Sequence, residues 1–482
     1  MDEDVLNNEQ AQPTFGKCLL IQNSQLQLDS IPLSLKKLGY GVYPNDPSYN
    51  DLRFDYNKLF NYFPKAIFYP RNKTEIVYLI NKLVTNKLVF VIRGGGRGFS
   101  PVSISDDYVV DLSHLISKFD ISTDRKTVTV DAGFKIGEII EALGKHSLLT
   151  NTVPDGCIGI IGSSLASGFT VLKRMYGLAS DSIVSAKMIN YKGELLYLDK
   201  DNYSDLFWAI KGAGNGNFGI ITEITLNTYE DIWLKSETLT WKWNKTTAIQ
   251  IFKLYQKQIA TYPKNVSGEF FMEYNNSLAS FTITIYVFGK STPIADYTNI
   301  FKHIGEPIII GYSGYYSKTF DKWGIHVGVT GLAGVFSKAK SSIILKPISD
   351  SGIISLVNSI ELFLQLKLDC KYVIDLQQFG GEIRNGSGSF AFKEAIGLVF
   401  YLIRWSQTSI SGKINKLLKE IYTNNVKYIS QYCIFSFIDY DLSQSEYMNA
   451  YFGNNTNRLI EIKKKYDPHN LFKYKQSIPI KH

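Results

Sequence analysis

Three glycine-dense stretches constrain the fold of this 482-residue chain more than any other feature. The first, VFVIRGGGRGFS at residues 89–100, passes from a β-branched run into four glycines, with Arg93 just before them and Arg97 among them. The others lie at residues 156–169 and 211–226. Glycine lets backbone N–H groups converge on an anion without obstruction by a Cβ atom. Three such loops favour a long phosphate-bearing ligand, and three unrelated tight turns are the alternative.

Two common nucleotide motifs do not fit these loops. The first loop lacks the G-K-[S/T] ending of a Walker A loop. The third contains G-x-G-x-x-G in Gly214, Gly216 and Gly219, but a helical pattern precedes it and a strand pattern follows. A dinucleotide fingerprint requires the reverse order, so we do not predict a Rossmann site.

Local patterns predict an α+β protein. Residues 71–84 predict a helix with Asn72 and Glu75 at capping-box spacing, followed by a short buried strand and the first glycine loop. After about residue 229 the chain becomes rich in aromatic residues and alternating strands. A helix there carries Ala248, Phe252, Tyr255 and Ile259 on one face, which indicates a sheet covered by helices.

Composition and residue spacing argue against several kinds of site and partner. The net charge of +8 is spread along the chain, and the densest basic run, EIKKKYDPHNLFKYK, is typical of a solvated helix face rather than a nucleic-acid site. Four distant cysteines and six histidines show no metal-ligand or disulfide spacing. The acidic N-terminus and the lack of a long apolar run indicate a soluble intracellular protein without membrane spans, and leave a particle-associated location open.

The combined motifs resemble the berberine bridge enzyme-like FAD-linked oxidases, within the vanillyl-alcohol oxidase superfamily that has the PCMH-type FAD-binding fold. The resemblance covers nearly all of the first 230 residues and the last 35, and the middle third matches loosely. Its most specific part is the C-terminal element, which matches the family pattern at Tyr451, Gly453, Asn455, Arg458, Leu459, Lys463, Tyr466, Asp467, Pro468, Asn470 and Phe472.

The resemblance implies four regions, namely a polar tail at 1–15, an FAD-binding domain of two α+β subdomains at 16–230, a substrate domain with an antiparallel sheet under helices at 231–430, and a returning segment at 431–482. FAD would rest its pyrophosphate on residues 93–98 and 159–163 and its adenosine half near 219–221. The implied cofactor residues are Arg93, Gly94, Gly95, Gly96, Arg97, Gly98, Phe99, Cys157, Gly159, Gly162, Ser163, Gly168, Gly219, Ile220, Ile221, Tyr451 and Asn455.

The chain departs from the family pattern at the flavin attachment points. Arg97 takes the place of the histidine that tethers the flavin, and Ser163 stands at another usual histidine position. Asp155 aligns with the family's second tethering residue, a cysteine, and Cys157 lies two positions later. Guanidinium is a poor nucleophile, so we expect non-covalent FAD, with Cys157 as the alternative attachment point. The Arg97 cation is expected to face the FAD phosphates or ring edge; exposure to solvent is the alternative.

The chain also departs from the pattern at the substrate side. Phe169 and Phe400 replace residues that handle protons in the family and suggest an apolar substrate pocket. Tyr440 then remains as the matched proton acceptor, with Asp439 as its helper. The alternative is that Tyr440 and Asp439 satisfy each other at the end of a strand.

Two functions follow from the resemblance. The first is an oxidoreductase that takes hydride from a small-molecule substrate onto flavin N5 and passes electrons to oxygen. The second is a flavin-fold protein with a structural or binding role and little turnover. The substrate and the oligomeric state cannot be read from the sequence.

Overall fold

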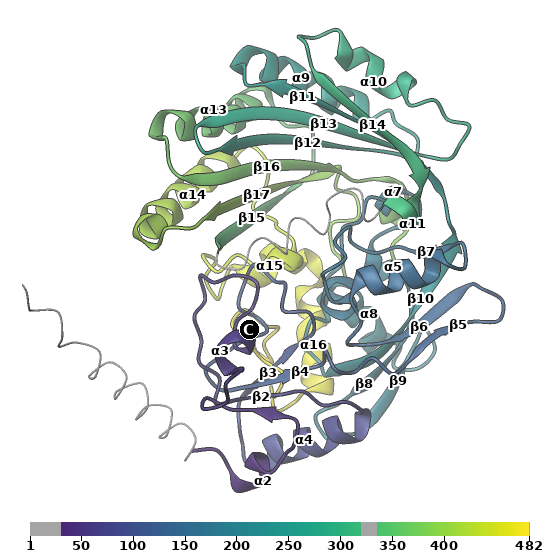
Figure 1. Ribbon diagram of the computed structural model, residues 1–482, viewed down its shortest axis with the longest axis vertical. Helices are drawn as coiled ribbons and strands as arrows, with labels where there is room; N and C mark the ends of the chain where they lie inside the picture. The colour runs from purple at the N-terminus through teal and green to yellow at the C-terminus, as the bar shows by residue number, and fades with distance from the viewer. Residues whose placement is uncertain (1–29, 320–334, 482) are drawn as a thin grey trace, which may run out of the picture.

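The computed structural model describes residues 30–319 and 335–481, so the predicted polar tail and the first part of the predicted FAD domain lie outside the described residues. Three sheets and their helices make up the molecule, which confirms the predicted α+β class (Figure 1). Within the described ranges, no helix has both the length and the apolar character needed to cross a membrane.

The first sheet positions the first glycine loop. Its strand order is β1-β2-β4-β3, with β2, β4 and β3 parallel and β1 antiparallel. The strands are β1 (Gly41–Val42), β2 (Ala66–Phe68), β3 (Phe90–Arg93) and β4 (Tyr108–Asp111). Helix α4 (Lys73–Thr85) leads from β2 to β3, and its N-cap Asn72 accepts a hydrogen bond from the Glu75 amide at 2.9 Å, as its spacing predicted. The glycine loop begins directly after β3.

The second sheet is antiparallel and is built around the long strand β10 (Ile220–Glu230). Its order is β5-β6-β10-β8-β9, and β7 pairs with the far end of β10. The other strands are β5 (Phe119–Ile121), β6 (Thr127–Asp131), β7 (Leu148–Thr150), β8 (Ile183–Ile189) and β9 (Leu195–Leu198). Its helices are α5 (Ile136–Gly144), α6 (Ile160–Leu165), α7 (Lys173–Tyr176) and α8 (Ser204–Ala213). The second glycine-dense stretch surrounds α6, and the third leads from α8 into β10.

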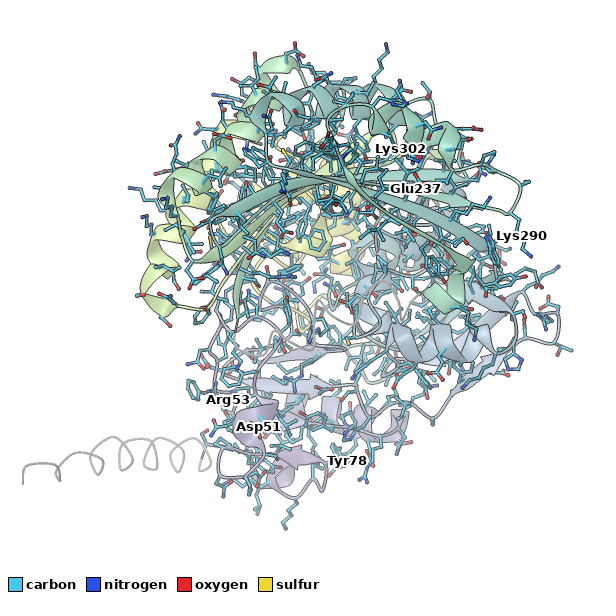
Figure 2. The ribbon with its side chains drawn as sticks, turned by 45° about the horizontal axis from the view of Figure 1, so that its top comes forward. Asp51, Arg53, Tyr78, Glu237, Lys290 and Lys302 are labelled. Atoms are coloured by element: carbon cyan, nitrogen blue, oxygen red, sulfur yellow. The ribbon has the colours of Figure 1, made fainter. Side chains whose placement is uncertain are left out.

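The third sheet has seven antiparallel strands in the order β14-β11-β13-β12-β16-β17-β15. They are β11 (Trp233–Lys242), β12 (Val266–Asn275), β13 (Leu278–Phe288), β14 (Ile308–Tyr315), β15 (Phe336–Ile344), β16 (Cys370–Gln378) and β17 (Gly397–Trp405). Helices α9 (Lys245–Ile259), α10 (Ala295–Lys302), α13 (Asp350–Leu366) and α14 (Ser411–Val426) cover its outer face (Figure 1). An ion pair of 2.8 Å between Lys302 and Glu237 ties α10 to β11 (Figure 2).

The inner face of this sheet turns toward the first two sheets. Alternation along β12, β16 and β17 places one set of side chains in the apolar core under the helices and the other set on this inner face. The predicted apolar face of α9 is buried at Ala248, Phe252 and Tyr255. The helix-covered sheet predicted for this region is therefore present.

The C-terminal segment returns to the first two sheets through α15 (Tyr447–Phe452) and α16 (Thr456–Tyr466). The basic run of α16 was interpreted as a solvated helix face, and this is wrong for Lys463, which is fully buried. Its ammonium group pairs with Asp467 at 2.7 Å and donates to the backbone oxygens of Asn217 and Phe472 at 2.6 Å. Burial of an ammonium group requires such partners, and here they fasten the segment beside the third glycine loop.

Candidate FAD and substrate site

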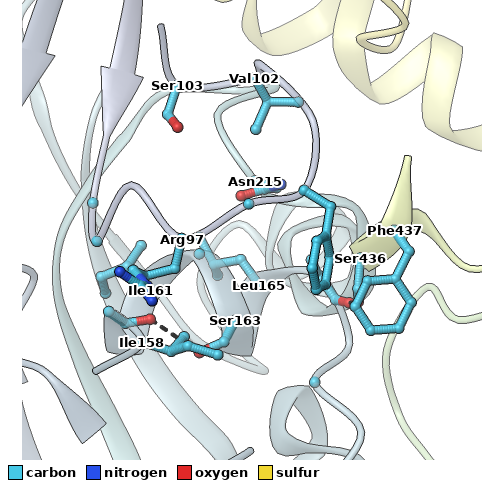
Figure 3. Close-up of a pocket in the computed structure, with 18 of the residues that line it drawn as sticks. Arg97, Val102, Ser103, Ile158, Ile161, Ser163, Leu165, Asn215, Ser436 and Phe437 are labelled. Atoms are coloured by element: carbon cyan, nitrogen blue, oxygen red, sulfur yellow. Dashed lines mark hydrogen bonds between the residues drawn. The ribbon is translucent and has the colours of Figure 1, made fainter. Parts of the chain in front are cut away.

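A cavity of about 420 Å³ lies where the glycine loops meet the inner face of the third sheet. Its wall includes residues 94–100, residues 158–159 and 161–163 around α6, and residues 472–474 of the returning segment. Strands β12, β16 and β17 contribute side chains at its other end. Figure 3 shows Arg97 close to Ile158, Ile161 and Ser163 on one side, with Ser436 and Phe437 across from them. The lining therefore includes residues of the predicted FAD-binding domain, the predicted substrate domain and the returning segment.

Two glycines allow the first two glycine loops to touch. A Cβ atom on Gly95 would lie 2.5 Å from the Gly159 nitrogen, and one on Gly159 would lie 2.7 Å from the Gly95 nitrogen. Gly96 has φ +60°, a left-handed conformation that favours glycine. Gly94, in contrast, has open space at its Cβ position and lines the cavity. Gly95 and Gly159 thus allow the two loops to come into backbone contact, whereas Gly94 leaves room for a ligand.

The first loop presents unsatisfied donors beside the cavity. Among the described residues, none accepts a hydrogen bond from the amide N–H groups of residues 94–98. The Nη2 atom of Arg97 is buried and also has no acceptor in the described part of the chain. Buried donors of this kind need partners, and a phosphate anion can accept several of them. This set of donors fits the pyrophosphate of FAD.

Arg97 faces the cavity rather than open solvent. Its guanidinium carbon lies 4.5 Å from the centre of the Tyr56 ring, and its side chain is half-buried. Burial lowers the pKa of Arg97, and the charge of Asp155 opposes that shift. Because an arginine stays protonated in proteins, this position keeps its positive charge.

Most residues implied to contact the cofactor line the cavity, and five do not. Those in the lining are Gly94, Gly95, Gly96, Arg97, Gly98, Phe99, Gly159, Gly162, Ser163, Gly168, Gly219 and Ile221. Those outside it are Arg93, Cys157, Ile220, Tyr451 and Asn455.

Arg93 and Tyr451 have structural partners instead. Arg93 is buried below the loop, where its guanidinium pairs with Asp111 and lies 3.5 Å from Asp55. The Tyr451 hydroxyl binds the Asp439 amide at 2.7 Å and Gln476 at 2.8 Å. Their side chains therefore support the loop and the returning segment.

One end of the cavity is aromatic. Phe169 and Phe400 both line it, and Phe99 and Phe437 join them. The Phe400 and Phe437 ring centres are 4.2 Å apart, and Phe169 stacks on Phe379 at 5.1 Å. These rings form a rigid apolar wall opposite the glycine loops.

Neither Tyr440 nor Asp439 lines the cavity. The Asp439 carboxylate is buried and pairs with the Lys340 ammonium at 2.6 Å. The Tyr440 hydroxyl approaches the Lys475 backbone oxygen at 3.5 Å, and burial raises its pKa above the usual value. The geometry thus gives no support to a proton-accepting role for this pair, and the two side chains do not satisfy each other either.

The sequence did not predict the three polar residues that the described strands of the third sheet contribute to the lining. Glu269 on β12, Gln377 on β16 and Arg404 on β17 all face the cavity from the third sheet. The sequence shows that these residues alternate with apolar residues along their strands. Nothing in the sequence indicated which face of the sheet would lie against the glycine loops. Among the described residues, no group of His, Cys, Asp and Glu side chains is arranged to hold a metal ion.

Comparisons with known proteins agree with this geometry. Residues 64–199 match the FAD binding domain family, and residues 435–479 match the family described as berberine and berberine like. The chain is 26% identical to the uncharacterized FAD-linked oxidoreductase YgaK of Bacillus subtilis, over 92% of this chain and 97% of that protein. It is also 26% identical to cannabidiolic acid synthase-like 1 of Cannabis sativa, over 86% and 84% of the two chains.

Solved structures show the same fold. BBE-like 1 of Physcomitrella patens superposes with a TM-score of 0.84 at 22% identity, covering 93% of this chain and 98% of that one. The C166A variant of berberine bridge enzyme gives 0.82 at 20% identity, over 92% and 98%. The cavity, the two family matches and these relatives agree: the chain carries an FAD binding domain and a berberine-like C-terminal domain, is similar over most of its length to FAD-linked oxidoreductases, and shares the fold of the berberine bridge enzyme-like structures.

Proposed function

We propose that this chain oxidises a small alcohol- or amine-type substrate with FAD held without a covalent bond, and that molecular oxygen takes the electrons. One observation carries the proposal. A single cavity joins a loop with unsatisfied donors to an aromatic and polar face of the third sheet, so a cofactor and a substrate can share it.

Non-covalent binding is supported by the residues near the loop. Arg97 stands where the family pattern has its tethering histidine, and it cannot form that bond. Cys157 is absent from the cavity lining, and its amide donates to the Asp155 carboxylate at 2.9 Å. Retention of FAD would then depend on the loop amides, on Arg97 and on burial of the cofactor.

The positions of the lining residues suggest which of them would bind the cofactor and which would bind the substrate. Bound FAD supplies a two-electron acceptor for hydride. The amides of residues 94–98 and Arg97 hold the phosphates, Phe169 and Phe400 exclude water from the substrate, and a group on the third sheet accepts the proton. Phe169 and Phe400 stand at two of the family's proton-handling positions, and the matched Tyr440 does not line the cavity, which supports a proton acceptor elsewhere in the lining.

The proposal is tested with purified full-length protein. We expect a yellow protein whose colour stays in the supernatant after acid precipitation, and chromatography should identify the released compound as FAD. An alcohol, sugar or amine should bleach the colour anaerobically, and air should restore it with formation of hydrogen peroxide. Colour in the pellet would contradict non-covalent binding, and failure of reconstitution with FAD would contradict the function.

A further inference from the structure

Glu269 is the one carboxylate that the third sheet contributes to the cavity among the described residues. It lies on the inner face of β12, opposite Gln377 of β16, and its side chain is 9% exposed. A buried carboxylate in an active-site cavity is costly unless it is held by partners, so its surroundings indicate what it can do.

The two oxygens of Glu269 differ. Oε2 accepts a hydrogen bond of 2.9 Å from the Tyr286 hydroxyl on the neighbouring strand β13. Tyr286 is the one hydrogen-bond donor found for this carboxylate among the described residues, and it binds Oε2 and not Oε1. One oxygen therefore fixes the orientation of the carboxylate, and the other remains available to a molecule in the cavity.

A second carboxyl lies diagonally across the strand pair. Asp375 is two residues before Gln377 on β16, and Gln377 donates to its Oδ2 atom at 2.8 Å. Burial, and then the charge of Glu269, raise the pKa of Asp375 well above its ordinary value. Two close carboxyl groups in a low dielectric do not both ionise readily. The raised pKa favours the protonated form of Asp375 beside Glu269.

Lys173 is the amine that lies beside the two carboxyl groups. This residue of α7 is 1% exposed, and burial lowers its pKa while Glu269 and Asp375 oppose the shift. The remaining titratable neighbours are Tyr286 and Tyr255, whose hydroxyl pKa values are raised by burial and by Glu269. Glu269 lines the cavity, whereas the other members of this cluster do not, so Glu269 is the member that a substrate can reach.

We propose, on the basis of the oxidase function above, that Glu269 is the proton acceptor of the reaction. The substrate C–H bond breaks and its electron pair leaves as hydride to the bound flavin. The O–H or N–H bond on the same carbon's substituent breaks, its proton passes to Oε1 of Glu269, and a C=O or C=N bond forms. Tyr286 is then a positioning residue that holds Oε2.

Stopped-flow reduction of the FAD-loaded full-length protein tests this step. Anaerobic protein is mixed with benzyl alcohol, cellobiose or benzylamine, and flavin absorbance is followed. Glu269→Gln should slow reduction by about 10²- to 10⁴-fold, the usual contribution of general base catalysis. Flavin content and melting temperature should stay at the wild-type values, and added formate should restore part of the rate in Glu269→Ala.

Glu273→Gln is the matched control. Glu273 lies on the same strand, pairs with Lys371 at 2.8 Å and does not line the cavity, so its removal should leave reduction unchanged. Tyr440→Phe and Asp375→Asn test the other candidate acceptors.

The possible results separate the two proposals. If none of the three compounds reduces the wild-type flavin, the proposed oxidation fails and the role of Glu269 fails with it. If wild-type protein is reduced and Glu269→Gln matches its rate, the oxidase function stands and Glu269 is not the acceptor. A loss confined to Tyr440→Phe or Asp375→Asn would overturn the proposal in the same way.

Discussion

At the residue scale, Arg97 combines two properties that rarely occur together in a folded protein. Its guanidinium has a buried nitrogen without an acceptor among the described residues, and its side chain lines the cavity. Stacking on the Tyr56 ring orients the Arg97 guanidinium but provides no hydrogen-bond acceptor for its buried nitrogen. The arrangement costs stability in the protein alone and favours an anion at this place.

Arg97→Ala should weaken FAD binding by about 1.5 to 3 kcal/mol, because a hydrogen bond from a charged group is lost. Fluorescence titration of the apoprotein with FAD measures the dissociation constant. Arg71→Ala is the control, since the Arg71 side chain is 62% exposed and does not line the cavity. Equal affinity in Arg97→Ala and wild type would mean that Arg97 serves only to pack on Tyr56.

At the scale of elements, the two glycine loops behave as one unit. Gly95 and Gly159 bring their backbones into contact, and this contact brings the unsatisfied amides of residues 94–98 to the cavity wall. Close packing of backbone on backbone leaves no flexible side chain that could give way.

Gly95→Ala should therefore separate the loops. Overpacking of this kind typically costs about 1 to 3 kcal/mol, and FAD content should fall as well because the donor groups move apart. Denaturant unfolding of the apoprotein gives the stability change. Gly94→Ala should leave apoprotein stability near the wild-type value, since nothing lies within 4 Å of its Cβ position. Equal stability of both variants would contradict the loop contact.

At the scale of the whole molecule, buried charges join parts that are distant in the sequence. Glu223 of β10 pairs with Lys73 at the start of α4 at 2.7 Å and with Lys187 of β8 at 3.0 Å. Burial alone would raise the pKa of Glu223, but Lys73 and Lys187 lower it to about 2. The carboxylate thereby links the first sheet's helix to the second sheet.

The lowered pKa has a consequence for acid stability. A carboxyl with a depressed folded pKa stabilises the protein above its unfolded pKa of 4.5, and this contribution disappears as the pH falls toward about 2. Glu223→Gln should lower the unfolding free energy by about 3 kcal/mol at neutral pH and flatten its decline in acid. Denaturant unfolding across this pH range measures both. Glu141→Gln, in an exposed pair, should change neither.

Local order in this protein could be predicted because it depends on neighbouring residues. Asn72 and Glu75 are three positions apart and form the predicted cap of α4, and the β-branched run before the first loop forms β3. The glycine loops were also recognisable, since a backbone without Cβ atoms is a property of the residues themselves. The resemblance to the family further predicted the FAD cofactor and the C-terminal segment that returns to the first two sheets.

The proton-handling groups could not be predicted, because their positions depend on contacts between distant parts of the chain. Tyr440 looked suitable in the sequence but packs beside Lys475 outside the cavity, and Asp439 pairs with Lys340 of β15. The residues around Glu269 in the sequence gave no indication that it would line the cavity. It became a candidate when strand register set it opposite Gln377 and beside the hydroxyl of Tyr286.

The sequence by itself thus determined the α+β class, the helices and strands with strong periodicity, and the glycine loops, since these follow from short-range hydrogen bonding and side-chain period. The tertiary structure determined which polar groups share the cavity and that Lys463 is buried. It also brought the backbones of Gly95 and Gly159 into contact. The physical reason is that desolvation and pairing of a charge depend on what packs against it, and packing joins segments that the sequence keeps far apart.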